Sequence, residues 1–208
     1  SVEVYKDGQI YSQSYKIGKP DEPVKVIGKC SAEKHGTKVT FHPDPTIFEE
    51  TVYDYDTLKQ RLRETAFLTK GLRIVLSDAR VDPVHTHEFH YAGGIKEFVT
   101  YLNKSKEALY PEVIYCEGTR DGVYVEVAMQ HNDSYNDATY SFVNNIITPE
   151  GGTHLAGFRN ALTKTFNTYA RANKILKDTE PALTGDDIRE GLTAIISIKI
   201  EEPQFEGQ

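Results

Sequence analysis

Alternating apolar and polar residues mark the first part of the chain as strand-rich. Apolar positions 2, 4, 10 and 15 flank Asp7-Gly8, the kind of dipeptide that closes tight two-residue hairpins. Residues 24–27 and 38–41 predict two more short strands. Pro43-Asp44-Pro45 then breaks the pattern, and residues 46–49 favour a helical turn. We therefore expect a domain boundary near residue 48.

From Asp56 onward the apolar period changes to that of helices alternating with strands. Leu58 and Leu62 open a predicted helix that ends at Gly71, and further helices are expected over residues 94–104 and 155–171. Thr184 is expected to open a short helix with acidic residues in its first turn. The predicted strands cover residues 73–76, 88–91, 113–117, 123–130, 139–145 and 192–200. The pattern predicts a strand-rich piece, 1–48, followed by an α/β domain, 49–208.

The longest predicted helix follows a Pro/Gly turn at residues 149–152. Gly151 and Gly152 permit backbone angles closed to other residues, and Thr153 is placed to cap the helix. Helical spacing predicts that this helix buries five apolar side chains: Leu155, Phe158, Leu162, Phe166 and Tyr169. Local chemistry indicates a strand–turn–helix joint and no reaction.

Composition limits the classes of function that fit. The 208 residues carry a net charge of −7 and are 38% hydrophobic, as in globular proteins, and no apolar run could cross a membrane. The acidic balance argues against a broad nucleic-acid surface. Cys30 and Cys116 form no disulfide framework, and with no signal peptide visible a cytoplasmic location is expected. Cys116 lies mid-strand, so a buried thiol is expected.

Few residues suggest chemistry by themselves. His35-Gly36-Thr37 is most simply a turn leading into a strand, although the Thr37 hydroxyl could hydrogen-bond in a nucleotide pocket. His85, His87 and His90 could suggest zinc, but on a strand the first two share one face and His90 points the other way. The glycine pairs 93–94 and 151–152 lack a P-loop continuation and favour helix entry. We expect no catalytic pair and no metal site, so the residues alone predict a soluble α/β fragment.

Several longer motifs resemble a known family. They are Tyr53-Asp54-Tyr55-Asp56-Thr57-Leu58 with Arg61-Leu62-Arg63-Glu64; Tyr91-Ala92-Gly93-Gly94-Ile95-Lys96; Asn144-Asn145-Ile146 with residues 151–159; and residues 185–197. In this order they resemble the B subunits of bacterial DNA gyrases, and the equivalent subunit of topoisomerase IV is a close relative. These are the ATPase subunits of type IIA DNA topoisomerases. The resemblance covers essentially the whole chain.

The resemblance implies a division of the chain. Residues 1–48 are similar to the last strands of a GHKL-type ATPase domain. Residues 49–208 are similar to the transducer domain, which resembles domain 2 of ribosomal protein S5: a mixed sheet with helices on one face and a left-handed βαβ crossover. The implied function is to couple ATP binding and hydrolysis to DNA strand passage, as in negative supercoiling by gyrase.

The same resemblance assigns four positions. Gly36 and Thr37 match the strand bordering the adenine pocket, and Lys6 matches a basic position at the pocket mouth where many relatives carry arginine. Gln208 matches the first residue of a Gln-Thr-Lys loop whose lysine contacts the γ-phosphate. The family's catalytic glutamate, Mg-binding asparagine and adenine-reading aspartate match nothing here. No catalytic residue or metal ligand is therefore expected, ATP and Mg²⁺ act in the parent protein, and the isolated fragment is expected to bind neither and to be inactive.

Partners and alternatives follow from the same comparison. The parent is expected to bind a gyrase A-type partner and DNA and to dimerise with ATP, while the fragment is expected to be monomeric and away from membranes. The chain starts without an initiator Met and ends in a loop with no capping or stop signal, so both ends are expected to be cut. One alternative is a stand-alone S5-like binding module without ATP linkage. Another is a small metalloenzyme using His85, His87 and His90.

Overall fold

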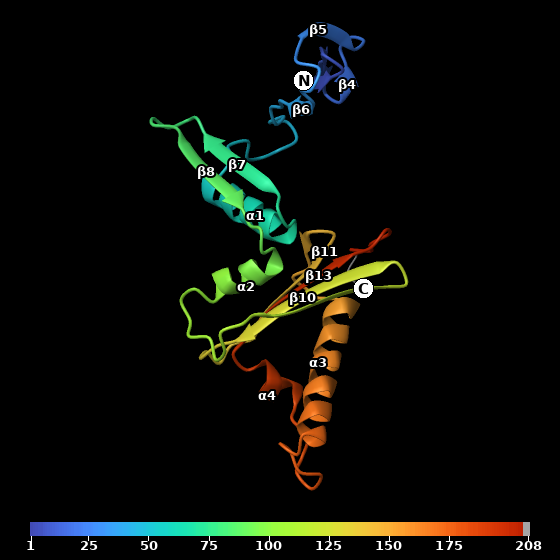
Figure 1. Cartoon of the computed structure of the whole chain (residues 1–208). Coiled ribbons are helices and arrows are strands. Elements are labelled where there is room, and N and C mark those ends of the chain that lie inside the picture. Colours follow the sequence, from blue (N-terminus) through green and yellow to red (C-terminus); the bar gives the residue numbers. More distant parts are fainter. Residues whose placement is uncertain (206–208) are drawn as a thin grey trace. The chain divides into compact units, whose positions relative to one another are not determined.

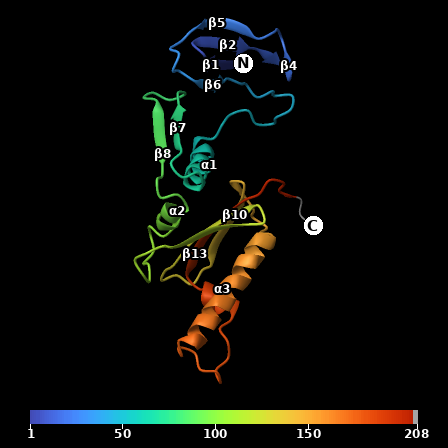
Figure 2. The ribbon, with the colours of Figure 1, turned by 45° about the vertical axis from the view of Figure 1, so that its right-hand side comes forward.

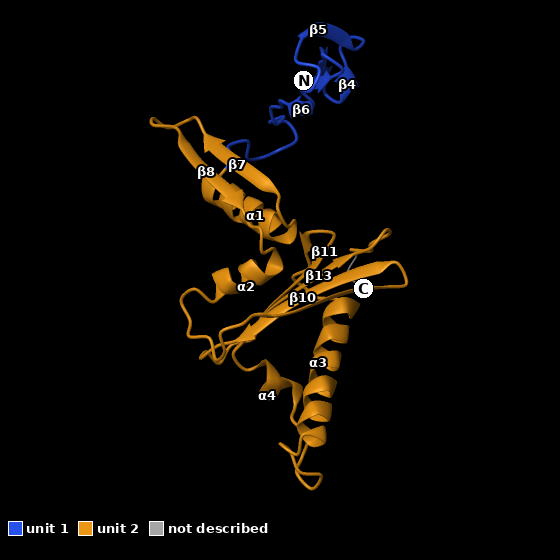
Figure 3. Ribbon diagram, in the orientation of Figure 1, with its two compact units in different colours: residues 1–53 blue, residues 54–208 orange. Residues whose placement is uncertain are grey.

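A computed structural model of the chain describes residues 1–205 and divides the chain into two compact units, Ser1–Tyr53 and Asp54–Gln208 (Figure 3). The division falls five residues beyond the boundary expected after residue 48. Within the described residues, no helix combines the length and apolar character needed to cross a membrane.

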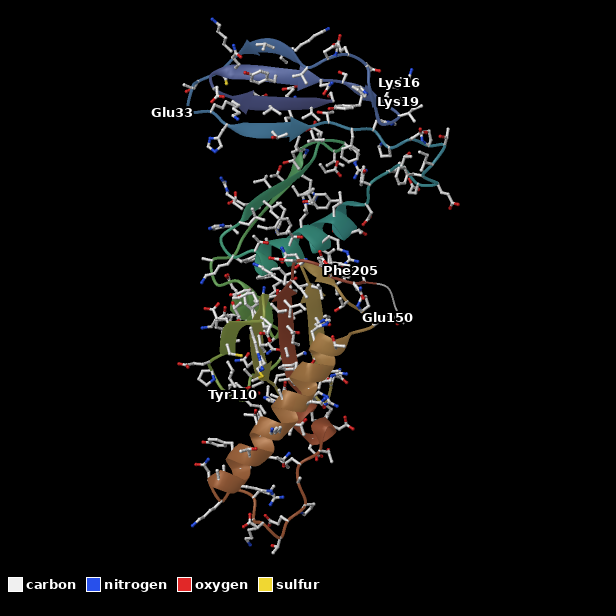
Figure 4. All side chains as sticks on the ribbon, turned by 90° about the vertical axis from the view of Figure 1, so that its right-hand side faces the viewer. Lys16, Lys19, Glu33, Tyr110, Glu150 and Phe205 are labelled. Carbon is white, nitrogen blue, oxygen red and sulfur yellow. The ribbon has the colours of Figure 1, made fainter. Side chains whose placement is uncertain are left out.

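The first unit is a four-stranded antiparallel sheet. Its strands are β1 (Val2–Lys6), β2 (Gln9–Gln13), β5 (Lys25–Lys29) and β6 (Gly36–Val39), in the order β5-β2-β1-β6. Asp7 and Gly8 join β1 to β2 with φ of 52° and 74°, which confirms the predicted tight turn. A small hairpin of β3 (Tyr15–Lys16) and β4 (Lys19–Pro20) was not predicted (Figure 4). The expected helical turn is a single turn, in which the backbone N–H groups of Ile47 and Phe48 donate to the Asp44 carbonyl.

The second unit begins with a helix, a hairpin and another helix. These are α1 (Tyr55–Leu68), β7 (Arg73–Asp78), β8 (His85–His90) and α2 (Ile95–Leu102). Asp54 caps α1 by accepting a 2.7 Å hydrogen bond from the Thr57 backbone N–H. The hairpin is longer than predicted, because β7 continues to Asp78 and β8 starts at His85.

A five-stranded mixed sheet forms the centre of the second unit. Its strands are β9 (Ile114–Arg120), β10 (Val123–His131), β11 (Ala138–Val143), β12 (Ile146–Ile147) and β13 (Leu192–Lys199), in the order β12-β11-β13-β10-β9. Strands β11 and β13 run parallel, whereas the other neighbours are antiparallel. The parallel pair is connected through α3 (Thr153–Ala172) and α4 (Gly185–Arg189). The mixed sheet confirms the predicted fold class; the handedness of this connection stays a prediction.

Successive side chains of β13 alternate between two hydrophobic cores, one on each face of the sheet. Ile195 packs with Phe67, Phe98 and Phe142 under α1 and α2. Ile196 and its even-numbered neighbours pack with Leu162 of α3 on the other face. The helices therefore cover both faces of the sheet, α2 on one and α3 on the other (Figures 1 and 2). The expectation of helices on one face was wrong in this detail, because α2 also packs on the sheet.

Three local predictions need correction and one is confirmed. Gly152, with φ of 143°, is the N-cap of α3, and Thr153 makes no capping hydrogen bond. Tyr169 is 63% exposed and is not part of the buried face, whereas Leu162 is buried. Cys116 is exposed because the whole of β9 is an exposed edge strand. Thr184 caps α4 in a reciprocal capping box with Asp187, as predicted.

Candidate functional site

The sheet of the first unit brings two of the predicted site residues to one face. Thr37 lies directly opposite Val4 across the β1–β6 ladder. Lys6 is two positions beyond Val4 on the same strand, so alternation places it on the same face. Gly36 precedes Thr37 with φ of 150°, a conformation that side chains rarely adopt. Val4, Lys6 and Thr37 therefore lie on the same face of the sheet.

The face that carries Thr37 exposes several valines. Val39 lies opposite Val2 and is 62% exposed, and Val26 lies opposite Tyr11 and is 53% exposed. At one end of this face is a hollow of about 1420 Å³, whose lining includes Val2, Val39, Phe41, Ile47 and Phe48. An apolar sheet face of this kind needs a covering element or a ligand.

The opposite face of the same sheet is polar and internally paired. Glu3 accepts hydrogen bonds from the Tyr5 hydroxyl at 2.9 Å and the Lys38 ammonium at 3.2 Å. Both bonds lower the pKa of the Glu3 carboxyl, and the bond to Glu3 raises the pKa of the Tyr5 hydroxyl. The ammonium of Lys34 lies 4.1 Å from the centre of the Tyr5 ring. The polar groups of this face are thus paired with one another, whereas Lys6 and Thr37 lie on the other face.

The fourth assigned residue is Gln208. Gln208 is outside the described residues, so its matching to a γ-phosphate loop stays a prediction. Among residues 1–205 there is also no cluster of three or more histidine, cysteine, aspartate or glutamate side chains that could hold a metal ion.

The three histidines of β8 lie as strand alternation predicts. His85 pairs with Asp78 and stacks on the Tyr55 ring at 4.5 Å between ring centres. His87 follows on the same face as His85, and burial lowers the pKa of its imidazole. His90 lies on the opposite face, across from Arg73. The three rings do not converge, so the structure offers nothing for the metalloenzyme hypothesis.

The two glycine pairs serve as helix entries, as predicted. Gly94 and Gly152 are the N-caps of α2 and α3, with φ of 60° and 143°. A side chain at Gly152 would approach the His154 ring to 3.0 Å. His154 is held by Thr148, 3.2 Å from Nε2 to Oγ1, and burial lowers the pKa of its imidazole. The joint is a packed structural element.

Comparison with known proteins gives the same result by sequence and by structure. A family model described as DNA gyrase B matches residues 94–208. The DNA gyrase B protein of Clostridium acetobutylicum is 55% identical over all 208 residues, which are 32% of that relative. The counterpart from Halalkalibacterium halodurans is 51% identical over the same span, again 32% of the relative. The chain therefore spans about a third of the length of these curated relatives.

Solved structures match both units. The 43K ATPase domain of Thermus thermophilus gyrase B, solved with an aminocoumarin, is 37% identical with a TM-score of 0.86, over 99% of this chain and 56% of that one. The topoisomerase IV ATP-binding domain of Francisella tularensis is 25% identical with a TM-score of 0.77, over 100% of this chain and 55% of that one. The fold is thus that of the ATPase region of type II DNA topoisomerases. Within that class, the chain belongs to the DNA gyrase B family.

Proposed function

We propose that this chain is the coupling part of the ATPase subunit of an ATP-dependent type IIA DNA topoisomerase of the gyrase kind. The observation that carries the proposal is the match of both units, at a TM-score of 0.86, to a gyrase B ATPase domain. In this proposal, residues 1–48 complete a GHKL-type ATPase domain and residues 49–208 form the transducer. The parent protein would work with a gyrase A-type partner and DNA and would dimerise with ATP.

The open face of the first sheet fits one side of a nucleotide site. Valine side chains suit the flat apolar surface of a base, and within the described residues the Thr37 hydroxyl makes no hydrogen bond that would compete with a ligand. Lys6, exposed at the end of β1, offers a positive charge on the same face. Lys6 would therefore attract an anionic ligand without the bidentate geometry of an arginine.

In this proposal the Mg²⁺ ligands lie in the rest of the parent protein. Among residues 1–205 no group of three or more histidine, cysteine, aspartate or glutamate side chains could hold a metal ion, and Mg²⁺ otherwise depends on one or two carboxylates together with the nucleotide phosphates. Phosphoryl transfer to water also needs a group that positions the attacking water. We therefore assign this chain base contact and mechanical coupling, and we leave the hydrolytic step to the rest of the parent.

The genomic context gives the first test. Codons before Ser1 that encode an ATPase helix, and Thr-Lys after Gln208, are the expected result. A start codon immediately before Ser1 and a stop codon after Gln208 would instead support a stand-alone S5-like binding module.

A substitution in the full-length parent gives the second test. Thr37→Ala should raise the KM for ATP by about two- to tenfold, because one ligand hydrogen bond is lost, and should leave kcat nearly unchanged. Ser12→Ala is the matched control, since Ser12 lies opposite Glu3 on the polar face. Equal KM values for Thr37→Ala and the wild type would refute the assignment of Thr37 to the nucleotide site.

A further inference from the structure

The second unit contains a groove that the proposed function does not use. It has a volume of about 620 Å³ and lies between α1, α2 and the β11–β12 edge of the sheet. Its floor includes Phe98 and Phe142, which are 5% and 1% exposed, and Ile147, which packs against the same core. Tyr101 and Tyr140 form an aromatic rim and are 41% and 40% exposed. The volume falls in the range of small-ligand sites, and the lining divides into an apolar floor and a charged wall supplied by α1.

Arg63 stands in this groove with its orientation fixed. Its Nη1 donates a 2.8 Å hydrogen bond to the Tyr101 hydroxyl. The centre of its guanidinium lies 5.1 Å from the middle of the Tyr101 ring and 5.9 Å from that of Phe89. The side chain is half-buried, and among the described residues no carboxylate forms an ion pair with it. A guanidinium held in this way keeps free N–H groups for an anion.

The charges along the groove favour an anion with a single charge. The charged residues of the lining are Lys59, Arg61 and Arg63 with Asp56 and Glu64, all from α1, so three positive and two negative side chains leave a net charge of +1. Arg61 and Glu64 already pair at 3.4 Å. A carboxylate carries one negative charge and matches the arginine fork, whereas a phosphate monoester carries about −1.5 to −2. The groove is positive although the whole chain carries −7.

We propose that this groove binds a small amphipathic carboxylate. The apolar body of the ligand lies on Phe98, Phe142 and Ile147, and its carboxylate accepts hydrogen bonds from Arg63. Tyr101 acts as a positioning residue, because its ring and hydroxyl hold the guanidinium. The site lies wholly in the second unit, whereas the proposed nucleotide contacts are in the first. Its existence does not depend on ATP binding.

The probe is 2-naphthoate, titrated into the 208-residue chain by isothermal calorimetry and by protein-observed NMR. We expect saturable binding, with shifts of the Ile147 methyl resonances. The uncharged analogue 2-naphthamide should bind at least about tenfold more weakly, because it offers no charge to the guanidinium. Arg63→Gln should weaken naphthoate binding by about tenfold or more, and Arg63→Lys should fall between, since it keeps the charge and loses the fork.

Two further variants separate binding from folding. Arg73→Gln is the matched control: it removes an arginine that pairs with Glu88 on the hairpin, outside the groove, and should leave the affinity unchanged. Tyr101→Phe keeps the ring and removes the hydroxyl, so it should weaken binding by about threefold while the circular dichroism stays that of the wild type. Absence of saturable binding, equal affinity for naphthamide, or full affinity in both Arg63 variants would overturn the proposal.

Discussion

The two units contrast in how their sheets are covered. Every fully buried side chain of residues 1–205 lies between Ala66 and Ser197, in the second unit. There, β13 is packed on both faces, by α2 and by α3. The first unit has a well-formed antiparallel ladder but no fully buried side chain, and one of its faces exposes valines. A complete ladder therefore does not imply a complete core.

The contrast indicates where each unit obtains its stability. Hydrogen bonds between strands contribute little net free energy, since water replaces them in the unfolded chain, and burial of apolar area dominates. The second unit buries its apolar side chains within itself, whereas the valines of the Thr37 face in the first unit need another element to cover them. This fits a first unit that completes a larger ATPase domain and a second unit that acts as a rigid transmitting body.

The largest expected effect follows from separating the units. Residues 54–208 expressed alone should unfold cooperatively in urea, because both cores lie within them. Residues 1–53 alone should show no cooperative transition, because so short a chain without a buried core cannot offset its conformational entropy. Far-UV circular dichroism during a urea titration measures whether each piece unfolds cooperatively. A sharp transition of the 1–53 peptide would show that the ladder suffices and would remove the contrast.

Two apolar substitutions, one in each unit, test the same contrast within the intact chain. Ile195 is fully buried, so Ile195→Ala should lower the free energy of unfolding by about 2–5 kcal/mol. Val4 is only half-buried, and Val4→Ala should cost about 1 kcal/mol or less. Urea denaturation of the two variants beside the wild type measures both values. Equal losses would mean that the Val4 face is covered as well as the Ile195 side.

Local turn and cap chemistry could be predicted from the sequence, because it depends on neighbouring residues. Asp7-Gly8 closes a hairpin as expected, and Thr184 caps α4. The turn before β12 was missed because Asn144 and Asn145 adopt φ of 49° and 66° without a glycine to mark them. Tyr169 keeps helical spacing but is exposed, since the end of α3 points away from the sheet (Figure 1).

Long-range pairing could not be predicted in this way. The parallel contact of β11 with β13 joins segments 55 residues apart, such as Ser141 with Ile196. A buried polar network was also missed: Asn103 accepts from Thr193 Oγ1 at 2.6 Å and donates to Gln130 at 3.0 Å. Polar residues between apolar ones look the same in sequence whether they are satisfied inside or exposed outside. The candidate site was only partly predictable for the same reason. Strand alternation places Lys6 on the same face as Val4, but only the β1–β6 pairing places Thr37 beside them.

The smallest effect concerns two aspartate–threonine pairs, one in each unit. In the second unit, Asp187 accepts hydrogen bonds from the Thr184 hydroxyl at 2.6 Å and the Thr184 N–H at 2.7 Å, which lower the pKa of its carboxyl. In the first, Asp44 accepts from the Thr46 hydroxyl at 2.7 Å and the Thr46 N–H at 2.8 Å, and the pKa of its carboxyl is lowered too. The chemistry is the same, but only the Asp187–Thr184 pair caps a helix, α4, whose Ile188 enters the core.

Thr184→Ala should therefore lower the free energy of unfolding by about 0.5–2 kcal/mol near neutral pH, whereas Thr46→Ala should leave the main transition unchanged. A depressed carboxyl pKa stabilises the fold above the pKa of the unfolded chain, and this contribution is lost as the pH falls through the folded value. The difference between wild type and Thr184→Ala should thus shrink between about pH 7 and about pH 2.5. Urea titrations at both pH values measure it. A difference that stays constant would place the effect of Thr184 in the hydrogen bond that its hydroxyl accepts from the Asp187 N–H and not in the Asp187 carboxylate.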